Sequence, residues 1–163
     1  MDAGTVVKVI HALVGVWLIA ALVGRWITLA QAARTTNLAA VHTLLALSQR
    51  FERMVIATSI VVLVLGVATA IVQGRPFLGP FQGAGVDWLF ASLVLYLATI
   101  PLVPLVFLPR GRVFAAALED ATEHGRVTDR LTGAFRDPVV LAAHVFEIGV
   151  VLAVFVLMIA KPF

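Results

Sequence analysis

The sequence predicts an all-α polytopic membrane protein built as a bundle of four transmembrane helices. Hydrophobic residues make up 61% of its 163 residues and charged residues only 13%. A soluble domain is about half apolar and about a quarter charged. The mean hydropathy is +1.05, and four apolar segments each approach the roughly 20 residues that a helix needs to cross a bilayer. Nothing indicates a second domain, so residues 1–163 are expected to form a single transmembrane unit.

The four expected spans are residues 6–25, 54–72, 88–108 and 138–160. The first ends beside Arg25 and Trp26, residue types that are common at membrane interfaces. We interpret it as a permanent span, because no small-x-small pattern marks a signal-peptide cleavage site. The second and third spans contain no charged residue. The fourth begins after Asp137 with Pro138, a capping residue followed by one favoured in the first helical turn.

The segments that join the spans differ in their expected structure. Asn37 is a favoured N-cap residue, so the second helix is expected to begin near Leu38 and to reach Val72, a length of about 52 Å. Residues 112–124 are expected to form a short amphipathic cytoplasmic helix between helices 3 and 4. Residues 74–85 are rich in Gly, Pro and Phe, and they are expected to lie on the headgroups or to fold back over the bundle.

The basic residues are distributed unequally between the two sides of the expected bundle. Nine arginines lie beside or within the loops that join the first span to the second and the third to the fourth, whereas the other side has only Lys8, Arg75 and Lys161. Cytoplasmic loops carry an excess of Lys and Arg. The distribution therefore predicts that the arginine-bearing loops are cytoplasmic and that both termini are periplasmic or extracellular.

The composition and the motifs exclude several classes of function. The absence of cysteine excludes disulfides, thiolate metal sites and cysteine nucleophiles. No P-loop, Rossmann fingerprint or HExxH pattern appears, so no motif predicts a metal site. The calculated pI is 10.2, but the net charge is only +3, and the arginines lie beside apolar segments. We therefore expect contact with the lipid bilayer and its anionic headgroups, and no nucleic-acid partner.

Polar residues inside the expected spans are the candidates for function, because lipid disfavours them. Ser92, Tyr96 and Thr99 share one face of the third span, where they are expected either to bond other helices or to line a path for a substrate or an ion. His11 lies in the outer part of the first span. It is expected either to bond a neighbouring helix near the headgroups or to be an axial ligand of haem b.

A second haem ligand would have to lie on the same side of the bilayer as His11. Met158, near the outer end of the fourth span, is the candidate, since His/Met ligation of haem exists. His144 is expected near the inner face, roughly 10–15 Å from His11 along the membrane normal. These two histidines are therefore not expected to hold one haem.

His144 and Glu147 carry the sharpest signal in the chain. They lie three residues apart on a helix and face the same way, about 9 Å and about 13 Å from Pro138 along the helix axis. A carboxylate near the midplane requires a proton or a cation. The candidate cations are Arg25, Arg50 and Arg53, with Glu52 expected to compete with Glu147 for them. A buried Arg–Glu ion pair, a proton relay and a metal site are the three alternatives.

Several short motifs carry a resemblance to a known family. They are His11 with Trp17, and the segments 50–53 (Arg-Phe-Glu-Arg), 128–132 (Thr-Asp-Arg-Leu-Thr) and 157–162 (Leu-Met-Ile-Ala-Lys-Pro). Together they resemble DUF2269, a bacterial family of predicted integral membrane proteins, over nearly the whole chain. The resemblance implies a bacterial inner membrane location and four helices, with no assigned activity. A more distant likeness is to the copper-resistance D-like and HemJ-type membrane proteins, which implies a haem-associated role for the early histidine.

Three functions follow from these observations. The leading hypothesis is a non-enzymatic accessory bundle whose helix faces and cytoplasmic loop bind other membrane-protein subunits or a second copy of the chain. The second is a b-type haem protein that uses His11. The third is a small proton-coupled transporter that uses His144 and Glu147.

Overall fold

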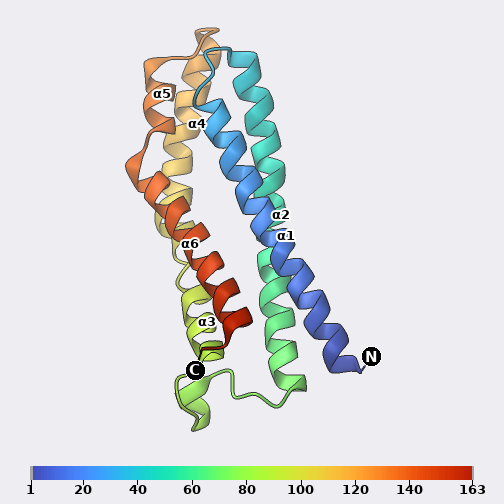
Figure 1. Cartoon of the computed structure of the whole chain (residues 1–163). Coiled ribbons are helices and arrows are strands. Elements are labelled where there is room, and N and C mark those ends of the chain that lie inside the picture. Colours follow the sequence, from blue (N-terminus) through green and yellow to red (C-terminus); the bar gives the residue numbers. More distant parts are fainter. Residues whose placement is uncertain (1, 163) are drawn as a thin grey trace.

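A computed structural model describes residues 2–162, and every regular element in that range is helical (Figure 1). Along the chain lie α1 (Ala3–Ala32), α2 (Leu38–Val72), the 3₁₀ turn η1 (Gly79–Gln82), α3 (Trp88–Leu97), the π-helical segment η2 (Val103–Phe107), α4 (Leu108–Glu123), α5 (Asp129–Phe135) and α6 (Pro138–Ala160). The prediction of an all-helical membrane bundle is thereby confirmed.

Helices α1 and α2 form a long antiparallel hairpin (Figure 1). Asn37 caps α2, since its side chain accepts a hydrogen bond from the backbone N–H of Ala40 at 3.2 Å. Small residues allow the two helices to approach closely: a Cβ added at Gly24 would lie 2.6 Å from the ring of Phe51 on α2. The buried residues Leu18, Ala21, Leu22 and Val55 form the apolar core of this hairpin.

Residues 88–108, expected to be one continuous span, are divided into two helical pieces. The α-helix α3 ends at Leu97, a turn follows over residues 98–101, and the chain then re-enters helix through the π-helical segment η2. Pro101 and Pro104 explain the break, because proline lacks the N–H that an α-helix requires and its ring crowds the preceding turn. Through the turn, the backbone bonds reach back three residues, as in Thr99 N–H to Tyr96 O at 3.1 Å.

This division bears on the number of membrane spans. By length and composition, three helical stretches within residues 2–162 could cross a membrane: α1, α2 and the stretch Asp129–Ala160 that contains α6. The apolar helix α3 has only 10 residues, fewer than the roughly 17–25 that a span requires. The expected count of four continuous spans is therefore not confirmed.

A second core lies at the end of the bundle where α4 and α5 pack on the first turns of α2. Its buried residues are Val41, Leu45, Ala117, Ala121 and Leu131. The expected amphipathic helix at residues 112–124 corresponds to the last three quarters of α4 and its C-cap, and α4 begins earlier because it continues directly from η2. Helix α5 was not expected from the sequence. Its signal is Thr128, whose hydroxyl caps the helix by accepting from the backbone N–H of Leu131 at 3.3 Å.

The two ends of the molecule carry different groups. Both termini and the connection 73–87 lie at one end, here called the terminal end, and the connections 33–37 and 124–128 lie at the other, here called the arginine end (Figure 1). Most of the 73–87 connection is exposed, Phe81 to 84%, but one part of it packs on α3. Gly79, with a positive φ of +52°, is buried against Phe90, and a Cβ at this position would lie 2.8 Å from that ring.

Candidate functional site

Arg25 is the centre of a buried polar cluster that joins three helices. Its side chain is 4% exposed, and it donates to Glu52 on α2 at 2.6 Å and to Glu147 on α6. The Nη2 atom also lies 3.2 Å from Nδ1 of His144, one turn before Glu147 on α6. A guanidinium has only donors, so this contact is a hydrogen bond in the tautomer of His144 whose proton lies on Nε2. These four residues are called the Arg25 cluster below.

Aromatic rings enclose the Arg25 cluster. The ring of Phe107 stacks on His144 with centroids 4.9 Å apart, and Trp26 meets the same imidazole edge-on at 6.5 Å. Phe107 also lies 5.9 Å from the guanidinium carbon of Arg25. Because Phe107 is the last residue of η2, the irregular segment after Pro101 positions this ring. Sequence reasoning missed Phe107, whose only signal was the paired prolines before it.

The geometry of the cluster is that of an ion-pair clamp. One arginine serves both carboxylates, so Glu52 joins Glu147 instead of competing with it, contrary to expectation. Arg53 is exposed and forms no ion pair with any residue in the range 2–162. Neighbours on a helix point about 100° apart, so Arg53 turns away when Glu52 faces α1. Arg50 is exposed as well.

The hydroxyl groups of α3 and the following turn divide between two kinds of bond. Tyr96 reaches across to α2, where its hydroxyl donates to the backbone carbonyl of Ser59 at 2.7 Å. Ser92 and Thr99 instead donate to carbonyls of their own segment, each at 2.7 Å. A short hydroxyl reaches its own preceding turn more easily than a neighbouring helix. Only one of the three therefore forms the expected bond between helices.

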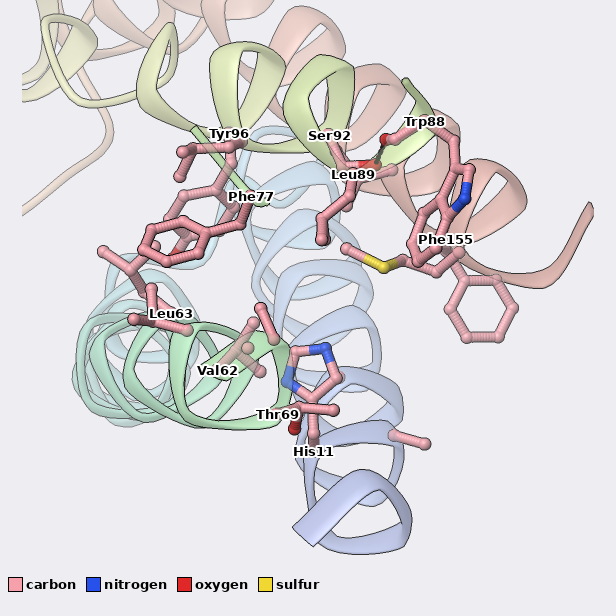
Figure 2. A pocket seen from close by; sticks show the side chains of 18 of the residues that line it. His11, Val62, Leu63, Thr69, Phe77, Trp88, Leu89, Ser92, Tyr96 and Phe155 are labelled. Carbon is pink, nitrogen blue, oxygen red and sulfur yellow. Dashed lines mark hydrogen bonds between the residues drawn. The ribbon is translucent and has the colours of Figure 1, made fainter. Parts of the chain in front are cut away.

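A separate cavity of about 440 Å³ lies between α1, α2, α3 and α6 toward the terminal end (Figure 2). His11 and Met158, the two sequence-predicted haem ligands, both line it. So do the hydroxyl-bearing residues Ser92 and Tyr96, while most of the remaining wall is apolar. We call this cavity the His11 pocket. None of the four residues of the Arg25 cluster lines it, so the two sites are distinct.

His11 is the one side chain within residues 2–162 that has a buried nitrogen or oxygen atom, here Nδ1, without a hydrogen-bond partner. Its ring rises from α1 beside Val62 and Thr69 of α2 (Figure 2). Gly66 makes room for it, because a Cβ at that position would lie 3.1 Å from Cε1 of the imidazole. Nδ1 itself has almost no exposed surface, so the rest of the imidazole lines the pocket.

The metal alternative for His144 and Glu147 lacks further ligands. Within residues 2–162, no three or more His, Cys, Asp or Glu side chains are gathered as a metal site. The carboxylate of Glu147 is bonded to Arg25, and Nδ1 of His144 faces the same guanidinium. The arrangement therefore favours the ion pair among the alternatives left by the sequence.

Comparison with known proteins identifies one family. A protein-family model described as "Predicted integral membrane protein (DUF2269)" matches residues 5–162. The resemblance to that family is thereby confirmed, whereas the more distant copper-resistance D-like and HemJ-type likeness is not shown. Neither the curated proteins nor the solved structures gave a match.

Proposed function

The chain belongs to the DUF2269 family of predicted integral membrane proteins. We propose that it acts in the membrane as a non-enzymatic helical bundle that binds a ligand. The Arg25 cluster holds α1, α2 and α6 in register, and the His11 pocket receives an apolar molecule from the membrane. The observation that carries the proposal is the pocket itself, whose volume lies within the range of about 300–1,000 Å³ typical of ligand sites.

The chemistry of the pocket wall supports binding over catalysis. The lining residues include no Asp or Glu, and the hydroxyls of Thr69, Ser92 and Tyr96 already donate to backbone carbonyls. A nucleophile with an adjacent general base, the arrangement that activates covalent catalysis, is not formed by these lining residues. What the wall offers is apolar area, one imidazole nitrogen and several basic groups.

A pair of matched substitutions on α2 tests the pocket. Val67 lines the cavity, whereas Val64, one turn away, is 61% exposed and does not line it. We expect Val67→Trp to fill the cavity and to abolish saturable binding of a dansyl-labelled fatty acid to the purified protein in detergent. Val64→Trp should bind the probe as the wild type does. Equal binding by both variants would contradict the proposal.

Haem b is a second candidate occupant, favoured by one specific observation. His11 and Met158 both lie on the wall of the pocket, so the two residue types of a His/Met ligand set line one cavity. Bound haem would supply electron transfer. The test is an absorption spectrum of protein expressed in haem-replete cells: a Soret band that is lost in His11→Ala supports haem, and its absence from the wild type excludes it.

The proposal also includes the membrane in which the protein lies, its orientation and its partners. The nine-to-three distribution of basic residues supports a bacterial inner membrane orientation with the arginine end in the cytoplasm. Other membrane subunits or a second copy of the chain are the proposed partners. A topology reporter fused after Phe163 should give a periplasmic signal, and a cytoplasmic signal would overturn this orientation.

A further inference from the structure

We infer that the occupant of the His11 pocket is an anionic membrane lipid, with an acyl chain in the cavity and its phosphate among Lys8, Arg75 and Lys161. This inference rests on the proposed function, since it names the ligand class of the same pocket. It is carried by the placement of the basic residues, by the absence of ion pairs for them, and by the position of His11.

The three basic side chains of the terminal end all line this one pocket. The chain has 12 Lys and Arg residues, and the other nine lie on the far side or beside its loops. Lys8 comes from α1, Arg75 from the connection after α2, and Lys161 from the residue after α6. They are far apart in the sequence, so their meeting is a product of the fold. The lining residues contain no acidic side chain to balance them.

Trp88 brings two of these cations together. The guanidinium carbon of Arg75 lies 5.7 Å from the centre of its ring, and the ammonium nitrogen of Lys161 lies 5.4 Å from it. Such cation–π contacts hold both charges against one indole. Neither cation forms an ion pair with a residue in the range 2–162. An anion near this ring would be attracted to both cations.

The two acidic residues nearest this end are already committed to helix caps. Asp87 accepts from the backbone N–H groups of Leu89 and Phe90 at 3.1 and 2.9 Å. Asp2 accepts from the backbone N–H of Thr5 at 2.8 Å, and this bond lowers the pKa of Asp2 below its ordinary value. Neither carboxylate forms an ion pair with Lys8, Arg75 or Lys161 among residues 2–162.

His11 lies at the depth where a phospholipid changes from polar to apolar. Lys8 and His11 are three residues apart on α1, so they share a face and are about 4.5 Å apart along the axis. With the phosphate at the level of Lys8, the glycerol and ester oxygens come to the level of His11. The imidazole of His11 lines the pocket at that level.

The walls of the pocket between His11 and the arginine end fit a hydrocarbon chain. They are formed by apolar residues of the four surrounding helices, for example Leu18, Leu63 and Val154. α1 and α2 are long and apolar enough to cross a membrane, so a lipid would reach the cavity sideways from the bilayer. Lys and Arg side chains near the membrane surface attract anionic headgroups.

The test titrates the full-length purified protein with phosphatidylglycerol and with phosphatidylcholine of the same acyl chains, and measures bound lipid by native mass spectrometry. We expect phosphatidylglycerol to bind at least tenfold more tightly. The triple variant Lys8→Gln, Arg75→Gln, Lys161→Gln should lose roughly 100-fold in affinity for it, about fivefold for each cation at low salt. If the triple variant does not fold, each single variant should show its own fivefold loss.

A charge-matched control removes three exposed arginines elsewhere: Arg34→Gln, Arg112→Gln and Arg126→Gln. This control should retain wild-type affinity within about threefold. Equal binding of the two lipids, tighter binding of oleate than of phosphatidylglycerol, or equal losses in the two triple variants would overturn the anionic-lipid inference. Val67→Trp distinguishes failure of the anionic-lipid inference from failure of the proposed function. If this variant leaves all lipid binding unchanged, the cavity is not the binding site and the proposed function itself fails.

Discussion

The Arg25 cluster and the His11 pocket both place polar side chains among apolar helices, but they satisfy those side chains differently. In the cluster, His144 contacts Arg25 and stacks on Phe107, and the arginine is bonded to two carboxylates. In the pocket, His11 has a buried nitrogen without a partner among residues 2–162, and three cations surround an apolar cavity. The cluster is internally complete, as a structural clamp requires, whereas the pocket is the site to which we assign an external ligand.

The largest expected effect comes from removing the cation of the cluster. Arg25→Met leaves Glu147 with only His144 beside it, and removing the cation of a buried pair costs about 3–5 kcal/mol. We expect a large fall in melting temperature in detergent, with Arg53→Met, an exposed arginine next to Glu52, as the control. Similar melting temperatures for the two variants would break the comparison, because the cluster would then not be a clamp.

Glu147→Gln distinguishes a clamp from a carrier. The variant loses a charged hydrogen bond, but Arg25 keeps Glu52, so we expect a smaller loss of about 2 kcal/mol. The measurements are thermal unfolding and pH-dependent flux in liposomes. A clamp predicts lower stability with no flux in either protein. Flux that is present in the wild type and abolished in the variant would instead assign a proton-coupled role to His144 and Glu147.

Gly24→Ala tests the close approach that brings Arg25 to Glu52. The added Cβ would lie 2.6 Å from the ring of Phe51, and overpacking of this kind costs about 1–3 kcal/mol. Gly15→Ala on the same helix is the matched control, since nothing lies within 4 Å of its Cβ position. We expect thermal unfolding to show destabilisation only for Gly24→Ala, and equal effects would argue against the close packing of α1 on α2.

The smallest expected effect is a pH dependence at the start of α6. Burial acts to raise the pKa of Asp137, but the hydrogen bonds from Arg110 and from two backbone N–H groups outweigh it and lower the pKa below the ordinary 3.8. A lowered pKa stabilises the folded state above about pH 3.8, and this contribution is lost as pH falls through the folded-state value.

Asp137→Asn should therefore flatten a small part of the acid limb of the stability profile, measured by thermal unfolding between pH 3 and pH 6. An unchanged acid limb would show that Asp137 contributes no pH-dependent stability.

Parts of the fold were predictable from local sequence because they depend on neighbouring residues. Asn37 before Leu38 and Asp137 before Pro138 mark the starts of α2 and α6, since a cap acts on the backbone groups next to it. The paired prolines were also evident in the sequence, but residues 88–108 were still expected to form one continuous span. Whether Pro101 and Pro104 kink a helix or divide it depends on the packing around them, and here they divide it.

The sequence predicted which residues could take part in the candidate site, but not how they pair. The spacing of His144 and Glu147 placed them on one face, and charge in lipid required a cation. Which arginine supplies that cation depends on the rotation of α1 and α2 about their axes. The sequence offered three candidates, and the structure pairs only Arg25 with Glu147, with Glu52 as a second partner.

By itself, the sequence determined that this is an integral membrane protein of apolar helices with unequally distributed basic residues, because hydropathy and charge are sums over local composition. The tertiary structure decided what those residues do together. It joined one arginine to two carboxylates, and it brought Lys8, Arg75 and Lys161 to the wall of one cavity beside His11. Such meetings depend on how helices distant in sequence cross and rotate, which no local pattern specifies.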